Sequence, residues 1–553
     1  MMFSNKSASA HDFAMVPRAD IPRSKFSMQK TLKTTFDSGY IVPIMCEEVL
    51  PGDTFNTNVT MFGRLATPIF PVMDNLHLES FFFFVPNRLV WTNWVKFMGQ
   101  QDNPADSISY SIPQQVSPAG GYAIGSLQDY FGLPTAGQVG VGNTVSHSAL
   151  PTRAYNLIYN QWFRDENLQN SATINTGDGP DASPATNYTL LRRGKRHDYF
   201  TSALPWPQKG GAAVTLPLGT SAPVYGTGVA LGLTDGSGIN FGMYSQNTNL
   251  TTSRSSVYNQ PLGTIAVGGS VQAADKALGV VGSGSSGLYA DLSLATAATI
   301  NQLRQSFQIQ KLLERDARGG TRYTEIIRSH FGVASPDARL QRPEYLGGGS
   351  TNISISPIAQ NSATGLSGST TPIGNLAAFG TFLGKGHGFT QSFVEHGYVI
   401  GLISVRADLT YQQGLRRHWS RSTRYDYYFP AFATLGEQSV LNKEIYVTGN
   451  TTQDNQVFGY QERWAEYRYN PSEITGLFRS TAAGTIDPWH YSQKFTSLPT
   501  LNTTFIQDTP PLARNLAVGA SANGQQLLLD AFFTTTAARP MPMYSVPGLI
   551  DHF

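Results

Sequence analysis

Apolar residues recur along much of this chain with the two-residue period of a β-strand, in which successive side chains point to opposite faces. Turn-forming clusters such as Pro51-Gly52-Asp53 separate the apolar runs. This combination predicts many short strands rather than a helical bundle. Strands are expected at residues 40–45, 55–65, 76–85, 396–405 and 457–469, the later ones in a region where strands return from residue 389 onward.

The strand expected at residues 76–85 contains four consecutive phenylalanines, Phe81–Phe84. Two of the four rings must lie on each face of the strand, and a buried Phe contributes roughly 1.5–3 kcal/mol. Both faces therefore need a cover. One pair fills the protein's own core, and the other pair lies under an inserted segment or a neighbouring subunit. The candidates for a subunit interface are Phe81, Phe83, Trp91 and Trp94.

Two segments show the period of a helix instead. In residues 151–170, one apolar stripe is formed by Tyr155, Ile158, Tyr159, Trp162 and Phe163. A helix that packs on a core explains this stripe better than a ligand groove does. The second segment places Ile300, Leu303 and Phe307 on one side, and it predicts a helical insertion over residues 291–345.

A change of composition marks residues 209–288, which contain 16 glycines and only five charged residues. A segment of this length without strong periodicity predicts either disorder or a surface excursion that carries function. Strands before it and after it indicate one discontinuous β domain, residues 36–553, whose halves are far apart in sequence. A jelly roll fits this organisation, because its sheets accept long insertions at their corners.

We distinguish the two ends of the chain from the insertions between them. Residues 1–35 contain six Lys and Arg residues and two Asp residues, a local charge of +4, and predict a basic N-terminal arm. Residues 500–553 are expected to form a C-terminal extension. The first twenty residues lack the apolar core of a signal peptide.

The composition limits the possible functions. Charged residues make up 14% of the chain, against roughly 25% in typical soluble proteins. A charge content this low is expected either of a subunit that is covered by copies of itself or of a neutral extracellular β protein. The net charge is +2 and the one cysteine is Cys46, so an intramolecular disulfide framework is excluded. No apolar run approaches the 18 or so residues of a spanning helix, and no membrane insertion is expected.

Catalytic, cofactor and metal motifs are weak. Residues 282–287, GSGSSG, match a dinucleotide-binding pattern but lack the acidic residue expected about twenty positions later. The ten histidines do not have the spacing of a metal site. We therefore assign no catalytic, cofactor-binding or metal-binding residue.

Two basic segments carry more information, residues 191–197 and 415–425. In the second, arginines are interleaved with aromatic residues, and cations with stacking rings are the two components of sequence-tolerant binding to single-stranded nucleic acid. The alternatives are a solvated basic loop, or arginines that pair with carboxylates across a subunit contact. The candidates for DNA contact are Arg416, Arg417, Trp419, Arg421 and Arg424, together with Arg18, Arg23 and Lys25 of the arm.

Five blocks, from the N-terminal half to the last residue, closely resemble the major capsid proteins of gokushoviruses, within the Microviridae. They read MDNLHLESFFFFVPNRLVW, RRGKRHDYFTSALPWPQKG, KLLERDARGGTRYTEII, ERWAEYRYNPSEITGLFRS and PGLIDHF. The resemblance implies an all-β fold, an eight-stranded antiparallel jelly roll with large loop and helical insertions. It also implies a T=1 icosahedral shell around a circular single-stranded DNA genome.

Further expectations follow from the resemblance. The insertion at residues 209–288 would project outward near the threefold axes and take part in host attachment, with Phe241, Tyr244 and Tyr258 as receptor-facing candidates. The implied partners are copies of this chain, the DNA genome, an internal scaffolding protein during assembly, a pilot protein and a host cell-surface receptor. The implied locations are the virion and, during assembly, the host cytoplasm.

The net charge of the chain predicts one further partner. A genome shared among the subunits of a small shell leaves on the order of tens of phosphates per chain, and a net charge of +2 cannot neutralise them. We therefore expect a separate small basic DNA-packaging protein. The rival hypothesis is an extracellular jelly-roll protein that binds or cleaves glycans; the missing signal peptide and the dispersed carboxylates argue against it.

Overall fold

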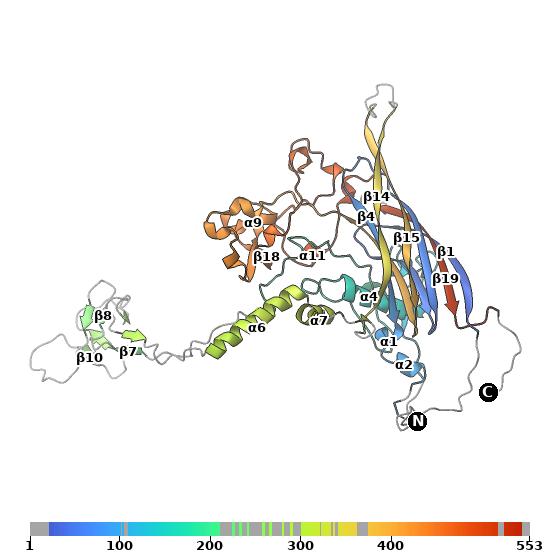
Figure 1. Cartoon of the computed structure of the whole chain (residues 1–553), viewed down its shortest axis with the longest axis horizontal. Coiled ribbons are helices and arrows are strands. Elements are labelled where there is room, and N and C mark those ends of the chain that lie inside the picture. Colours follow the sequence, from blue (N-terminus) through green and yellow to red (C-terminus); the bar gives the residue numbers. More distant parts are fainter. Residues whose placement is uncertain are drawn as a thin grey trace, which may run out of the picture. The chain divides into compact units, whose positions relative to one another are not determined.

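Eight long strands of the computed structural model pair into one antiparallel sheet system in the order β1-β19-β3-β15-β14-β4-β16-β2 (Figure 1). Their bounds are β1 Ser24–Phe36, β2 Val42–Val49, β3 Thr54–Leu65, β4 Leu76–Pro86, β14 Glu344–Ala359, β15 Leu376–Ser392, β16 Gly397–Ala407 and β19 Leu527–Arg539. The order forms two four-stranded halves, β1-β19-β3-β15 and β14-β4-β16-β2. This arrangement confirms the predicted eight-stranded jelly roll.

The structure describes most of the chain outside one long segment. The described ranges are residues 22–100, 102–103, 109–210, 300–320, 322–332, 334, 336–337, 341–361, 374–517 and 525–544, plus the backbone of short strands between 224 and 290.

Strand β14 joins the two halves. Its first part, through Ile353, pairs with β4, and its second part, from Ser354, pairs with β15. Figure 1 shows β14 and β15 as a long hairpin that extends beyond the other strands. Because one strand changes partner along its length, the sheet can fold over and enclose a core between its halves.

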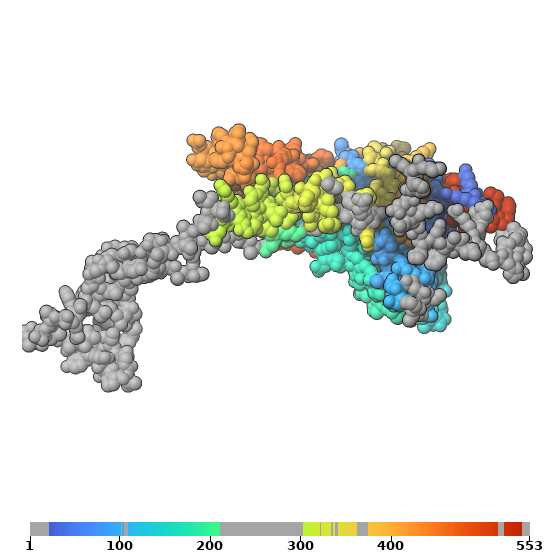
Figure 2. Space-filling view, turned by 60° about the horizontal axis from the view of Figure 1, so that its bottom comes forward, coloured from blue at the N-terminus to red at the C-terminus, as the bar shows by residue number. Residues whose placement is uncertain are grey.

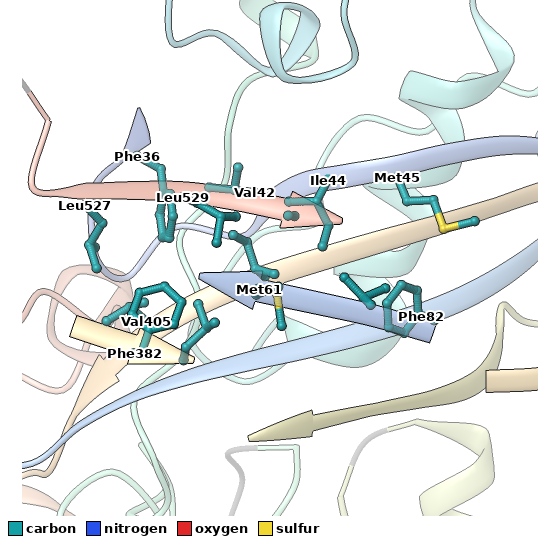
Figure 3. Close-up of a cluster of buried hydrophobic side chains, with 14 of the residues drawn as sticks. Phe36, Val42, Ile44, Met45, Met61, Phe82, Phe382, Val405, Leu527 and Leu529 are labelled. Carbon is teal, nitrogen blue, oxygen red and sulfur yellow. The ribbon is translucent and has the colours of Figure 1, made fainter. Parts of the chain in front are cut away.

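The main core lies between the two halves of the sheet. Figure 3 shows side chains from both halves that point toward one another, among them Met61, Phe82, Phe382 and Leu529. The register places Gly401 of β16 opposite Phe82, and a Cβ atom on Gly401 would lie 2.8 Å from that ring. The glycine therefore makes room for one of the four phenylalanines.

A second layer covers the outer face of the β14-β4-β16-β2 half. It contains helix α4 (Leu150–Ile158), which continues as the π-helical turn η2 (Tyr159–Phe163). The apolar stripe predicted for residues 151–170 faces the sheet in a second buried cluster. The helix is shorter than predicted, because Arg164 has extended backbone and the Asp165 carboxylate accepts hydrogen bonds from the next turn.

Segments near both ends of the sequence enter the sheet, and the first of them lies within the expected N-terminal arm. The expected arm, residues 1–35, becomes strand β1 at Ser24, and the expected C-terminal extension contains strand β19, which pairs with both β1 and β3. In β1, Lys25 and Lys33 point to solvent while alternate side chains face the core. The lysine-rich composition therefore concealed a half-buried strand.

Strands β14 and β15 begin earlier than the sequence indicated. Both contain several glycines, and glycine is depleted in strands. The structure gives the reason for two of them: a Cβ atom on Gly348 would lie 2.0 Å from the Ser80 carbonyl oxygen, and one on Gly349 would lie 2.9 Å from the His387 ring. These glycines allow close approach between neighbouring strands.

A lobe formed by residues 411–506 lies between β16 and β19 in the sequence. It contains β17 (Glu437–Leu441), β18 (Val457–Glu462) and the short helix α9 (Asn442–Ile445) around a third buried cluster. Figures 1 and 2 both show this lobe, in orange, beside the sheet. The strand expected at residues 457–469 is correct in its first half and ends at Glu462.

The residues from Ala212 to Leu313 form a separate structural unit, which includes most of the insertion predicted at 209–288. The described strands in it are short and pair in two- and three-stranded sheets, such as β8 (Gly232–Thr234) with β9 (Asn240–Gly242) and β10 (Val257–Asn259) with β11 (Ile265–Val267). Helix α6 (Ile300–Gly319), which begins in this unit, and helix α7 (Tyr323–Phe331) fall in the predicted helical insertion. Each helix within the described ranges is too short or too polar to cross a membrane.

Candidate functional site

The chain itself covers both faces of the phenylalanine-rich strand. Phe82 and Phe84 lie in the main core, and Phe83 lies in the second cluster with an exposed fraction of 1%. The Phe83 ring is 5.4 Å from Trp162, and the half-buried Phe81 ring is 5.3 Å from Phe163, measured between centroids.

This packing corrects the expected subunit interface. Trp91 and Trp94 are buried in the same cluster as Phe83, and the Trp91 indole N–H donates to Asp178 at 2.7 Å. All of these side chains are covered by the insertion between β4 and β14. The sequence correctly required a cover, and helix α4 with its continuation η2 supplies it within the same chain.

A cluster of charges lies on the same outer face, centred on Glu79 of β4. Three arginines contact this carboxylate: Arg193, Arg196 at 3.2 Å and Arg406 at 2.8 Å. Burial by itself would raise the pKa of Glu79, but Arg193 and Arg406 lower it to about 2. Arg196 also pairs with Asp408 at 3.1 Å, so the cluster sets three guanidinium groups against the two carboxylates of Glu79 and Asp408.

Behind this cluster, Lys195 and Asp508 are both buried. Burial lowers the pKa of Lys195 to about 8 and raises the pKa of Asp508 to about 6, the latter against the opposing charges of Arg406 and Lys195. The Lys195 ammonium group lies 4.3 Å from the centre of the Phe505 ring. The segment Arg192–His197, predicted to be basic, thus lies against the sheet rather than on a free loop.

A cavity with a volume of about 1320 Å³ opens beside these groups. We call it the arginine cleft. Its walls carry nine arginine and lysine side chains and six carboxylates. Glu79, Arg193 and Lys195 line it together with Arg318 of helix α6 and Arg468 of the lobe. Its lining therefore has a surplus of cations.

The arginines expected to contact DNA at residues 416–424 are largely engaged in ion pairs within the lobe. Arg416 pairs with Glu473, Arg417 with Glu444 at 3.0 Å, and Arg421 with Glu466 at 3.1 Å. Each of these three guanidinium groups therefore already has a carboxylate partner. The alternative that the sequence left open, pairing with carboxylates, holds for all three, but within one chain.

The Arg417–Glu444 pair is part of a buried network. The Glu444 side chain is 2% exposed, and it accepts hydrogen bonds from the Tyr199 hydroxyl at 2.8 Å and the Leu441 amide at 2.9 Å. Burial raises the pKa of Glu444, while Arg417 opposes this shift. These arginines hold the lobe together, so they are not available as free phosphate ligands.

Aromatic residues of the same segment are exposed instead. We call this group the aromatic ridge; it consists of Trp419, Tyr425, Tyr427, Tyr428, Phe429 and Tyr467. Of the remaining candidates for DNA contact, Arg424, Arg23 and Lys25 are exposed, and Arg18 lies outside the described residues.

The receptor-facing candidates fall in the separate unit. Phe241 lies on β9 (Asn240–Gly242) and Tyr258 on β10 (Val257–Asn259), where the structure describes the backbone alone. Tyr244 lies outside the described residues.

A second exposed apolar surface lies on the outer face of the β1-β19-β3-β15 half. Phe62 of β3, Leu383 of β15 and Phe532 of β19 are all exposed there, and the register places Phe62 opposite Leu383. This surface was not predicted. When apolar residues lie on both faces of a strand, the sequence does not indicate which face is covered. The signal was present in β3 and β19, where the exposed positions include large apolar residues.

Comparison with known proteins decides the family. Residues 14–549 match the family model described as "Capsid protein (F protein)". The chain belongs to this capsid protein family. Capsid protein VP1 of Bdellovibrio phage phiMH2K is 49% identical over 551 residues, which cover 98% of each chain.

Two further relatives extend the match. Capsid protein VP1 of Chlamydia phage 1 is 46% identical over 590 residues, with 97% of each chain covered. Capsid protein VP1 of Spiroplasma virus 4 is 37% identical over 560 residues, with 99% covered. These matches confirm the resemblance to gokushovirus capsid proteins of the Microviridae. The protein is therefore a structural capsid protein of a virion that assembles with copies of itself, and not an enzyme.

Proposed function

We propose that this capsid protein forms a closed T=1 icosahedral shell around a circular single-stranded DNA genome. The observation that carries the proposal is the jelly roll, together with the match of nearly the whole chain to phage capsid proteins. The exposed apolar residues on the outer face of β3, β15 and β19 support it, because large apolar patches on a monomer usually mark surfaces that another molecule covers. Symmetry closes such contacts, so that no adhesive surface stays open.

The arginine cleft supports contact with the genome. Its cations exceed its carboxylates by three charges, which suits a small number of phosphate contacts. The exposed basic residues Arg23 and Lys25 at the start of β1 add local contacts. These charges are too few for the tens of phosphates per subunit, so a separate small basic protein supplies the rest.

Host attachment is assigned to the insertion at residues 209–288. Its strands belong to a unit separate from the jelly roll, and a long excursion of this kind can change without disturbing the sheet. An internal scaffolding protein in the host cytoplasm and a pilot protein complete the proposed set of assembly partners.

Electron microscopy of particles from cells that produce the chain with its phage partners tests the shell. Closed particles of one size that protect circular single-stranded DNA from nuclease are expected. Open sheets, or monomers only, would contradict the shell. Particles that retain DNA after a high-salt wash with no other basic polypeptide present would contradict the packaging protein while leaving the shell in place.

A further inference from the structure

The aromatic ridge has an unusual exposure for a folded lobe. Its six rings have exposed fractions between 42% and 71%. With roughly 200 Å² per aromatic side chain, they present about 650 Å² of mostly apolar surface. The largest patch on a typical monomer is roughly 300–600 Å², and one partner in a standard interface buries about 800 Å². The ridge alone supplies most of one side of a stable interface.

The rings are held in place before any partner binds. The Arg421 guanidinium lies 5.1 Å from the Tyr427 ring centre and 4.6 Å from that of Tyr467. Tyr428 packs edge-on against the buried Trp464, with 5.7 Å between the ring centres. Surfaces whose side chains are already ordered lose less entropy on association.

The ridge is contiguous with a groove of about 520 Å³, which Trp419 and Tyr467 line together with Arg421. Tyr425 and Phe429 both contact the ring of Phe432, at 6.3 and 6.1 Å between centroids. Tyr428 lies 6.5 Å from Tyr467, so the two groups of exposed rings are linked along the chain through the consecutive residues Tyr427–Phe429.

Charge decides which partner suits this surface. Arg416, Arg417 and Arg421 are matched by Glu473, Glu444 and Glu466, so the three pairs carry no net charge. A surface that binds single-stranded DNA combines stacking rings with cations that are free to contact phosphates. A protein interface instead has a core rich in aromatic residues and arginine, and here the Arg421 guanidinium lies beside two exposed rings, those of Tyr427 and Tyr467.

We propose that the aromatic ridge is a contact surface for a second copy of this chain in the shell. The inference rests on the proposed shell and names one of its interfaces. It replaces the expectation that residues 416–424 bind DNA.

The test uses a double variant, Trp419→Ser with Tyr425→Ser, and a matched control, Trp419→Phe with Tyr425→Phe. Sedimentation velocity measures the concentration at which the chain assembles. The serine variant should need at least a tenfold higher concentration, and the phenylalanine variant should stay within threefold of the unmodified chain. Assembly of the serine variant at the unmodified concentration would overturn the inference.

Two further measurements separate the possible causes. The thermal midpoint of the unassembled serine variant and its affinity for a thymidine oligonucleotide at low salt should both be unchanged. A loss of oligonucleotide affinity with normal assembly would assign the ridge to DNA and overturn the inference. If the unmodified chain forms no shell in cells that also produce its phage partners, the proposed function fails instead.

Crosslinking gives an answer that does not depend on how the variants fold. A photoreactive benzophenone side chain at residue 425 of the full chain, activated in intact particles, should yield chain–chain dimers. Adducts to DNA alone, or no adduct between chains, would contradict a contact with a second copy.

Discussion

Replacement of Glu79 by Gln tests the charge cluster on the outer face of the sheet. The change keeps the shape of the side chain but removes the negative charge that Arg193, Arg196 and Arg406 share. The three guanidinium groups would then face one another with Asp408 as the nearest remaining carboxylate partner, through Arg196. The unassembled chain should become less stable at neutral pH.

The pKa of Glu79 sets the size of the effect. It falls from 4.5 to about 2 in the folded chain, and one pKa unit corresponds to about 1.4 kcal/mol, so the carboxylate contributes on the order of 3 kcal/mol. The Glu79 side chain is 13% exposed, and solvent screening reduces this contribution. We expect the variant to lose about 2–3 kcal/mol of unfolding free energy at pH 7.

The pH dependence has a definite sign. Because the folded pKa is lower than the unfolded one, the stabilisation is complete above pH 4.5 and is lost as the pH falls toward about 2. At pH 3.5 the difference between the variant and the unmodified chain should therefore be smaller by about 1.4 kcal/mol.

Urea denaturation of the unassembled chain, followed by tryptophan fluorescence at pH 7 and pH 3.5, measures both quantities. Glu48→Gln is the matched control, because Glu48 is exposed on β2 in the same half of the sheet, and it should change stability by less than about 0.5 kcal/mol. Equal stability of Glu79→Gln and the unmodified chain at pH 7, or a loss that is the same at both pH values, would refute the reasoning.

Three other predictions concern packing, the lobe and the insertion. Phe83→Ala should destabilise the unassembled chain by about 3–5 kcal/mol, whereas Phe62→Ala, at an exposed position, should cost less than about 1 kcal/mol; similar unfolding midpoints would show that Phe83 is not a core residue. Changing Arg416, Arg417 and Arg421 together to Ser should lower the thermal midpoint of unfolding, because buried Glu444 loses its partner at a cost of about 3–5 kcal/mol. Affinity for an oligonucleotide should change less than twofold. A large loss of affinity with an unchanged midpoint would restore the DNA assignment. Deletion of residues 215–285 should leave particle formation intact in electron micrographs and reduce adsorption to host cells; failure to form particles would make the insertion architectural.

The basic segments show how far local sequence can identify a site. Charge and aromatic residues at 415–425 are visible in the sequence, and they equally fit DNA binding and ion pairing. The partners of these arginines are 27 to 57 residues away, as for Arg417 with Glu444 and Arg416 with Glu473. No local pattern indicates such pairs, so the choice between the two interpretations needed the structure.

The sequence by itself determined the periodicity of the strands, the apolar stripe of the helix at residues 151–163, and the need to cover both faces of Phe81–Phe84, because each depends on neighbours along the chain. The tertiary structure alone decided that residues 24–36 and 527–539, which lie near opposite ends of the sequence, pair with each other. It also decided that Glu79 meets Arg406, 327 residues away. Such contacts depend on which strands become neighbours in the jelly roll, and that choice is made by the folding of the whole chain rather than by any one segment.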